Sequence, residues 1–268
     1  MMTRAAIRLF SLLALVFMVL PLAVILGSSL TETSFLAFPP QGITLKWYGV
    51  MLADPSYVSS FVTSTLLAAC ATVIAVVLVV PAALAIARYS FPGKGFVSSL
   101  LLSPLVLPHI VLGAALLQFG SGIGLTRSFL ALLVGHTVIV TPFILRSTLA
   151  MLSPAQRALE EASLDLGAGP VTTFFLIVLP QIRPGLVAGS IFAFISSWIN
   201  VELSIFNTNA ELSTIPVKLF NYVQYTVDPT IAAVSSLTII LAGLAIGTLE
   251  LTLGLHMLSD GRSERSTA

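Results

Sequence analysis

Long windows without charged residues constrain this chain more than any other feature of its sequence. A bilayer core is about 30 Å thick, and a helix needs roughly 20 apolar residues to cross it. A charged side chain at mid-bilayer costs about 2.5–3.5 kcal/mol on insertion scales, so charge-free windows locate the crossings. Six such windows are present, namely residues 9–31, 55–87, 95–126, 128–145, 184–201 and 229–249.

Composition supports a membrane protein built from helices. Hydrophobic residues make up 57% of the chain and charged residues 9%, whereas about 25% charged residues is usual in soluble domains. The windows are continuous rather than alternating, which excludes a transmembrane β-barrel. The first window follows Arg4 and Arg8, as a secretory signal would, but it is longer than the apolar region of such a signal. The sequence therefore predicts an all-α polytopic membrane protein with six transmembrane helices.

The distribution of Lys and Arg predicts the topology. If the N-terminus is cytoplasmic, nine of the twelve basic residues lie inside, and only Lys46, Arg127 and Lys218 lie outside. This bias follows the positive-inside rule. We therefore expect both termini and the 146–183 loop to be cytoplasmic, in a protein of the inner membrane.

Several kinds of chemistry find no support in the sequence. Cys70 is the single cysteine, so neither a disulfide nor a thiolate metal site is available, and the three histidines do not form a metal set. We expect His109 and His136 to be buried and hydrogen-bonded. The chain has no G-x-x-x-x-G-K-[ST] motif and cannot hydrolyse ATP itself. A net charge of +1 indicates no nucleic-acid partner.

The 146–183 loop has a pattern of its own. Ser153 and Pro154 are typical of a helix start, and Gly167 is typical of the residue that follows a helix. A second apolar helix, about 171–179, is expected to stop at Pro180. The sequence predicts two short helices joined by a glycine hinge at the membrane face.

The same loop resembles a known signature. Glu161-Ala162-Ser163, then Gly167, then Ile177-Val178-Leu179-Pro180 match the E-A-A, G, I-x-L-P spacing of binding-protein-dependent ABC importer permeases, which have the type I importer fold. Only Ser163 departs from the usual alanine. Residues 46–48, 142–146 and 228–235 are similar to the spermidine/putrescine-type branch of that family, and the resemblance covers about residues 40–258.

The resemblance implies a permease subunit that is not an enzyme and carries no cofactor. ATP and Mg would be bound by a partner, an ABC ATPase subunit dimer. The other implied partners are a second permease subunit, an external solute-binding protein and membrane lipid. The implied solute is a polyamine, another amino compound or an aminophosphonate. The residues expected to couple this chain to the ATPase are Glu160, Glu161, Ala162, Ser163, Gly167, Ile177, Leu179 and Pro180.

The expected organisation has three parts. Residues 1–56 form an N-terminal transmembrane helix and an external segment. Residues 57–258 form the importer transmembrane domain, with the coupling loop at 146–183. Residues 259–268 form a cytoplasmic tail.

A substrate pathway is predicted at the outer end of the fifth window, because polar groups within spans usually face a cavity. The candidates are Ser197, Trp198, Asn200 and Glu202. Trp198 would stack on a cationic amine, Asn200 would supply a hydrogen bond and Glu202 a charge. A second interpretation stays open, in which Trp198 is an interfacial anchor and Glu202 marks the water boundary.

Two other functions compete with the importer. An ion-coupled secondary transporter explains six spans, but it requires inverted repeats, and the sequence shows no clear internal repeat. A membrane-embedded hydrolase would use Gly120-Ser121-Gly122 with a histidine. That segment is an external turn, and the hydrolase leaves the signature loop unexplained.

Overall fold

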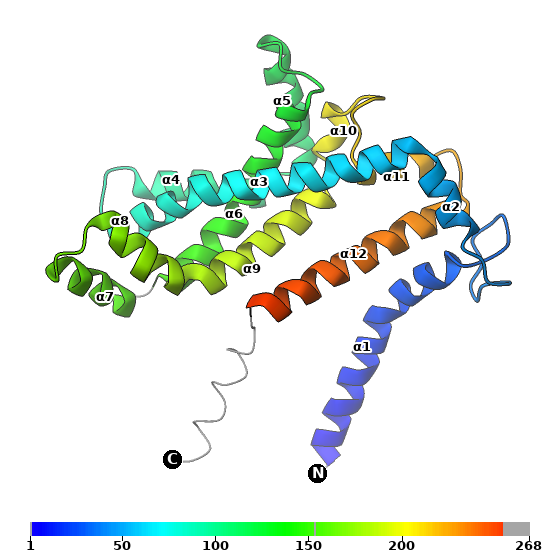
Figure 1. The fold of residues 1–268 in the computed structure, drawn as a ribbon. Coiled ribbons are helices and arrows are strands. Elements are labelled where there is room, and N and C mark those ends of the chain that lie inside the picture. The colour runs from blue at the N-terminus through cyan, green and yellow to red at the C-terminus, as the bar shows by residue number, and fades with distance from the viewer. Residues whose placement is uncertain (1, 153, 254–268) are drawn as a thin grey trace. The chain divides into compact units, whose positions relative to one another are not determined.

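A computed structural model describes residues 2–152 and 154–253, and within these ranges the secondary structure is helical. In chain order the helices are α1 Met2–Ser28, α2 Lys46–Ala53, α3 Pro55–Arg88, α4 Lys94–Leu102, the 3₁₀ helix η1 Ser103–Leu105, α5 His109–Gly122, α6 Phe129–Met151, α7 Pro154–Asp165, α8 Pro170–Thr173, the π-helix η2 Phe174–Val178, α9 Leu179–Trp198, α10 Ser204–Asn207, α11 Ile215–Val223 and α12 Pro229–Leu253 (Figure 1). The predicted all-α fold is confirmed.

The chain divides into two compact units. One unit contains Met1–Val58 and Lys218–Ala268, and the other contains Ser59–Val217. The second unit holds the coupling loop and the candidate pathway residues. Each unit is described by itself. The predicted tail, residues 259–268, lies outside the described residues.

In the first unit, α12 packs against α1 and α2. Two aromatic side chains anchor the segments between these helices. The Trp47 indole N–H donates to the carbonyl oxygen of Thr31 at 2.8 Å, and the Tyr222 hydroxyl donates to Asp228 Oδ2 at 2.8 Å. Buried donors that find acceptors in this way cost little free energy on folding.

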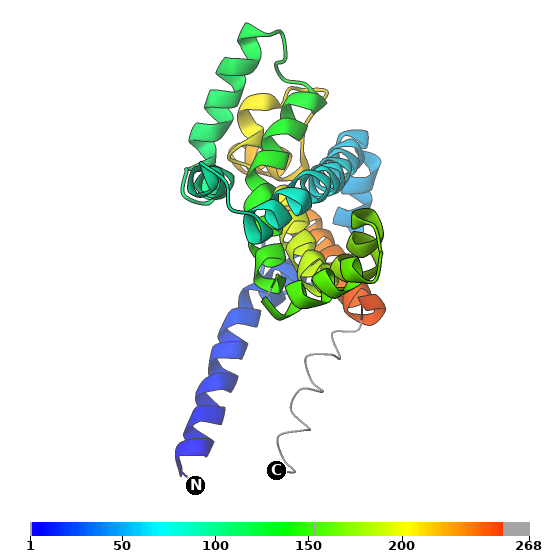
Figure 2. The ribbon, with the colours of Figure 1, turned by 90° about the vertical axis from the view of Figure 1, so that its left-hand side faces the viewer.

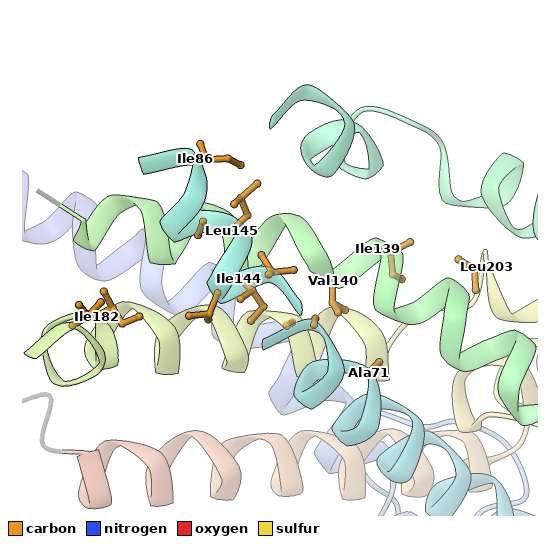
Figure 3. Packing of buried hydrophobic residues seen from close by; sticks show 14 residues of the cluster. Ala71, Ile86, Ile139, Val140, Ile144, Leu145, Ile182 and Leu203 are labelled. Carbon is orange, nitrogen blue, oxygen red and sulfur yellow. The ribbon is translucent and has the colours of Figure 1, made fainter. Parts of the chain in front are cut away.

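In the second unit, α3, α6 and α9 enclose the hydrophobic core. Ala71, Ala75 and Ala83 of α3 are fully buried, and their spacing in multiples of four residues places them on one face of the helix. Larger side chains of the same cluster include Ile144 and Leu145 of α6, Ile86 of α3 and Ile182 of α9 (Figure 3). Alternating small and large side chains let helices approach closely in a membrane.

Glycines on α9 bring its backbone close to α6. A Cβ atom added at Gly185 would lie 2.6 Å from the carbonyl oxygen of Ser147, and one added at Gly189 would overlap the Ser147 side chain. Both glycines are buried, four residues apart on one face. Small residues at this spacing are typical of tightly packed membrane helices.

Four helices among the described residues are long and apolar enough to cross a membrane: Ala6–Ser28, Pro55–Arg88, Phe129–Met151 and Pro170–Trp198. A bent pair, Lys94–Leu105 with His109–Gly122, can make a fifth. The sixth predicted span falls on α12, whose described apolar part, Pro229–Leu244, is shorter. The count of six therefore stays a prediction.

The third window is not one straight helix. Its sequence contains Pro104 and Pro108, which predict a kink, and the two halves are bent by 106° (Figure 2). Pro104 lies in the short 3₁₀ turn η1, and Pro108 precedes the first residue of α5. Proline lacks a backbone donor and its ring clashes with the preceding turn, so two prolines four residues apart separate two helices here.

The fifth span starts earlier than the sequence predicted. The helix runs without interruption from Pro170 to Trp198, so the expected stop at Pro180 and the expected start at 184 are both wrong. The reason is the π-turn η2, in which the Leu179 amide donates to the carbonyl oxygen of Phe174, five residues earlier. A widened turn accommodates the following proline without ending the helix.

Candidate functional site

Helix α7 ends in a turn that depends on glycine. Gly167 has φ of +89°, a conformation that side-chain-bearing residues rarely adopt. Its amide donates to the carbonyl oxygen of Leu164 at 2.9 Å, and the Ala168 amide donates to that of Ser163 at 3.1 Å. These two bonds form a Schellman motif, so Gly167 ends the helix as predicted. The expected N-cap, Ser153, lies outside the described residues.

The two adjacent glutamates of α7 have different surroundings. Glu160 accepts from the Arg88 guanidinium, with Nη2 at 2.6 Å from Oε1 and Nε at 3.1 and 3.2 Å from the two carboxylate oxygens. Glu161 pairs with Arg157 one turn earlier at 2.9 Å, and both side chains are more than half exposed. Exposed pairs of this kind contribute about 0.3–0.5 kcal/mol. Glu160 is thus fixed within the chain, whereas Glu161 lies at the surface.

Ser163 connects α7 to the next helix. Its hydroxyl lies 3.1 Å from that of Thr173 in α8, and Thr173 is buried. Ala162 is exposed beside it. The one departure of the signature from its usual alanine therefore provides a hydrogen bond across the Gly167 turn.

The last three signature residues lie on the long helix and not on a separate short one. Ile177 belongs to the π-turn η2, and Leu179 and Pro180 begin α9. Leu179 is half-buried and packs against the core cluster, while Pro180 is exposed. These residues connect the coupling loop directly to a membrane helix.

Several apolar side chains of α7 are uncovered. Leu159 is 56% exposed, Leu164 45% and Leu166 90%. We call the exposed residues Leu159, Glu161, Leu164 and Leu166 the α7 surface. Helical spacing places Glu161 and Leu164 on one side of α7 and Leu159 on the other, and Leu166 directly follows the helix. The α7 surface combines apolar area with a carboxylate, a composition suited to contact with another protein.

Most of the chain matches a known family of transport proteins. Residues 79–251 match the family described as binding-protein-dependent transport system inner membrane component. The chain belongs to this family. It is accordingly a multi-pass inner-membrane transport component, and its relatives are permease components and not enzymes.

Two curated relatives come from Escherichia coli strain K12. The putrescine transport system permease protein PotI is 31% identical over 203 residues, covering 73% of this chain and 72% of PotI. The spermidine/putrescine transport system permease protein PotC is 28% identical over 226 residues, covering 84% of this chain and 85% of PotC. The resemblance to the spermidine/putrescine-type branch is thereby confirmed.

Solved structures support the fold. A chain of a bacterial ABC transporter that imports the acidic polysaccharide alginate matches with a TM-score of 0.72. The match covers 93% of this chain and 95% of that one, at 16% sequence identity. At this identity the likeness concerns the fold alone.

At the C-terminal end of α9, a buried histidine organises a polar network. Ser204 Oγ donates to the carbonyl oxygen of Asn200 at 2.9 Å, which uses its only proton. His136 Nε2–H must therefore donate to Ser204 Oγ at 2.9 Å, and His136 Nδ1 accepts from the Ser197 hydroxyl at 2.7 Å. His136 is fully buried, as expected, and this tautomer satisfies both of its ring nitrogens.

Asn200 continues the network beyond α9. Its Oδ1 accepts from the Leu203 amide at 2.9 Å, and its Nδ2 donates to His109 Nδ1 at 3.0 Å. His109 is thus hydrogen-bonded, as the sequence predicted, but it is half-buried and not buried. The Asn200 side chain connects the end of α9 to α5 and α10, and its amide is used within the chain.

The two remaining pathway candidates differ in exposure. The Trp198 indole N–H donates to Thr65 Oγ1 at 3.2 Å, and its ring meets that of Phe61 edge-on at 5.3 Å. Glu202 is exposed. The structure thus brings Ser197 and Asn200 together around the His136 network, holds Trp198 against α3, and leaves Glu202 at the surface.

Sequence reasoning missed the partners that these residues use. Arg88 was assigned only to the cytoplasmic side, Thr173 and Ser204 were not considered, and Thr65 lies in a different span. Long-range partners have no local pattern in a single sequence. The one available signal was Arg88 itself, a charged residue at the end of an apolar window.

Proposed function

We propose that this chain is the permease subunit of an ATP-driven importer, coupled to its ATPase through α7. The α7 surface carries the proposal, because Leu159 and Leu164 of α7 and Leu166 directly after it are exposed apolar side chains outside the candidate membrane spans. Exposed apolar side chains can mark a site of contact with another protein, and Leu164 lies on the same side of α7 as Glu161. Glu161 would meet a basic group of the ATPase there, and Ala162 would permit close approach.

The remaining coupling residues have positioning roles in this proposal. Gly167 sets the angle at which α7 leaves the membrane helix. Ser163 holds α7 to α8 through Thr173. Ile177, Leu179 and Pro180 carry the displacement of α7 into α9, with which they form one helix.

The assembly that we propose has four kinds of component. Two ATPase subunits bind ATP and Mg and dock on α7. A second permease subunit completes the pathway, an external binding protein delivers the solute, and lipid surrounds the spans. Both termini are cytoplasmic, and residues 57–258 form the importer domain, preceded by the N-terminal segment 1–56.

A small amino compound of the polyamine type is the proposed solute. The named relatives PotI and PotC transport putrescine or spermidine and putrescine. At the outer end of α9, exposed Glu202 supplies a negative charge for an ammonium group. The polar atoms of Ser197, Trp198 and Asn200 already bond within the chain, so their proposed role is to shape the pathway wall.

ATP-dependent uptake by the reconstituted assembly tests the proposal. The chain is co-expressed with its candidate ATPase, second permease and binding protein, and uptake of labelled putrescine, spermidine, 4-aminobutyrate and 2-aminoethylphosphonate is measured. We expect uptake of one of these compounds, dependent on ATP and lost in Glu161→Lys. Glu211→Lys is the matched control, because it reverses an exposed carboxylate far from α7 in the sequence.

The competing function predicts a different result. An ion-coupled secondary transporter would take up solute without ATP and with Glu161→Lys fully active. That outcome would contradict the importer proposal. A loss of uptake in Glu211→Lys equal to that in Glu161→Lys would contradict the proposed role of the α7 surface in docking the ATPase.

A further inference from the structure

We infer that Arg88 is a positioning residue for energy coupling, through its ion pair with Glu160. This inference rests on the proposed function, since it assigns a role to a residue outside the signature in the same coupling step. Arg88 is the last residue of α3, and Glu160 lies 72 positions later on α7. The pair thus connects the end of one membrane helix to the middle of the coupling helix.

The geometry of this pair is that of a specific contact. Both nitrogens Nε and Nη2 of Arg88 approach the Glu160 carboxylate, the shortest distance being 2.6 Å. A planar guanidinium held at two points fixes orientation as well as distance. The side chains are 11% and 16% exposed, whereas those of the Arg157–Glu161 pair on the same helix are 55% and 60% exposed. Screening by water therefore weakens the second pair far more than the first.

The position of the contact gives it a mechanical consequence. Helix α7 is joined covalently to α6 at one end and, through Gly167, to α8 and α9 at the other. A rigid rod held at two ends can still rotate about the line that joins them. Glu160 lies between these ends, so its bond to Arg88 is a third attachment that, together with the Ser163–Thr173 hydrogen bond, opposes such rotation.

The third attachment also adds α3 to the elements that α7 can displace. Residues Val79, Ala83 and Ile86 of α3 are buried in the core cluster shared with α6 and α9. A push on α7 therefore reaches all three core helices. Without the Arg88–Glu160 pair, part of the displacement is absorbed by rotation of α7 about its ends.

A charge-swap series in the complete transporter tests this role. Arg88→Glu, Glu160→Arg and the double variant are compared for uptake per ATP hydrolysed. We expect each single variant to lower this ratio roughly tenfold, in the range of coupling effects measured for residues along such networks. The double variant should restore most of the ratio, because it re-forms the ion pair with the charges exchanged. If coupling instead required a base at position 88 or an acid at position 160, the double variant would stay uncoupled. Arg88→Lys should keep only part of the wild-type ratio, because an ammonium cannot match the two-point contact of the guanidinium.

Lys94→Gln is the matched control. It removes a positive charge from the first residue of α4, where Lys94 Nζ donates to the carbonyl oxygen of Tyr89. Its uptake per ATP should equal that of the wild type. For single variants that do not assemble, Glu160→Gln keeps the side-chain shape and removes the charge, and the same fall in the ratio is expected.

The outcomes separate this inference from the proposed function. Absence of ATP-dependent uptake in the wild type would refute the proposed function itself. Uptake driven by ATP in the wild type, with the ratio unchanged in Glu160→Gln and both single reversals, would overturn only the role of Arg88. A double variant as uncoupled as the singles would also overturn it.

Discussion

Substitution of Gly167 isolates the contribution of one backbone conformation to coupling. Gly167 has φ of +89°, and a Cβ atom added there would meet nothing within 4 Å. Crowding of the Cβ atom is therefore excluded as the cause of a defect in Gly167→Ala. The cost of a side chain is conformational, about 1–2 kcal/mol for a residue held in the left-handed region.

This free-energy cost lowers the fraction of molecules in which α7 ends in the native left-handed turn. An energy of 1.4 kcal/mol corresponds to a factor of ten, so Gly167→Leu should reduce the native turn about 5–30-fold relative to its alternatives. Asparagine tolerates the left-handed region, so Gly167→Asn should lose much less. If coupling requires the turn, uptake per ATP hydrolysed falls in the order Gly, Asn, Ala, Leu, whereas ATP binding by the ATPase is retained.

Gly169 provides the matched control for this series. It also has open space around an added Cβ atom, but its φ of −75° and ψ of 161° suit any residue. Gly169→Ala should therefore transport normally. Full uptake in Gly167→Leu would refute the reasoning, as would an equal defect in Gly167→Asn and Gly167→Leu. Either result would mean that the left-handed turn does not govern coupling.

Three further predictions concern stability. Gly185→Ala places a methyl group 2.6 Å from the Ser147 carbonyl oxygen and should lower the free energy of unfolding by about 1–3 kcal/mol. Gly95→Ala is the control, because an added Cβ atom there has open space. Thermal unfolding in detergent measures both variants. His136→Phe leaves the Ser197 hydroxyl buried without its partner and should cost about 1–3 kcal/mol, while Thr137→Val, which loses only a bond within α6, serves as control. The pKa of Asp54 is lowered by hydrogen bonds from the Ser56 hydroxyl and amide, and then by Lys218. The charge of Asp54 therefore stabilises the fold above the unfolded pKa of about 3.9. This contribution is lost as the pH falls through the lower folded pKa. The difference in unfolding temperature between wild type and Asp54→Asn should accordingly shrink between pH 6 and pH 3, and a constant difference would contradict the assignment.

Local chemistry explains which features the sequence predicted correctly. The end of α7 at Gly167 follows from a glycine in the left-handed region with Gly169 and Pro170 after it. The break near Pro104 and Pro108 follows from two missing amides. Both features depend on residues within one or two helical turns, so a single sequence contains the information that decides them.

The features that sequence reasoning missed depend on contacts between distant segments. The 106° bend after η1 is a matter of packing, because proline interrupts hydrogen bonding without fixing an angle. Pro180 was expected to end a helix, but the π-turn before it lets α9 continue. The pathway role of Ser197 and Asn200 stays a prediction, but sequence reasoning did not find their hydrogen-bond partners. The partners that occupy them, His136 and His109, lie more than sixty residues earlier.

The substitution of Ser163 for the usual alanine shows how the two kinds of information combine. In the sequence it is an exchange of one small residue for another, and nothing nearby in the chain gives its hydroxyl a role. In the fold, Thr173 lies 3.1 Å away on the far side of the Gly167 turn. The turn fixes where α7 ends, the Ser163–Thr173 bond fixes how it lies against α8, and the Arg88–Glu160 pair fixes its rotation. A displacement of α7 that leaves all three contacts intact must move the membrane helices with it.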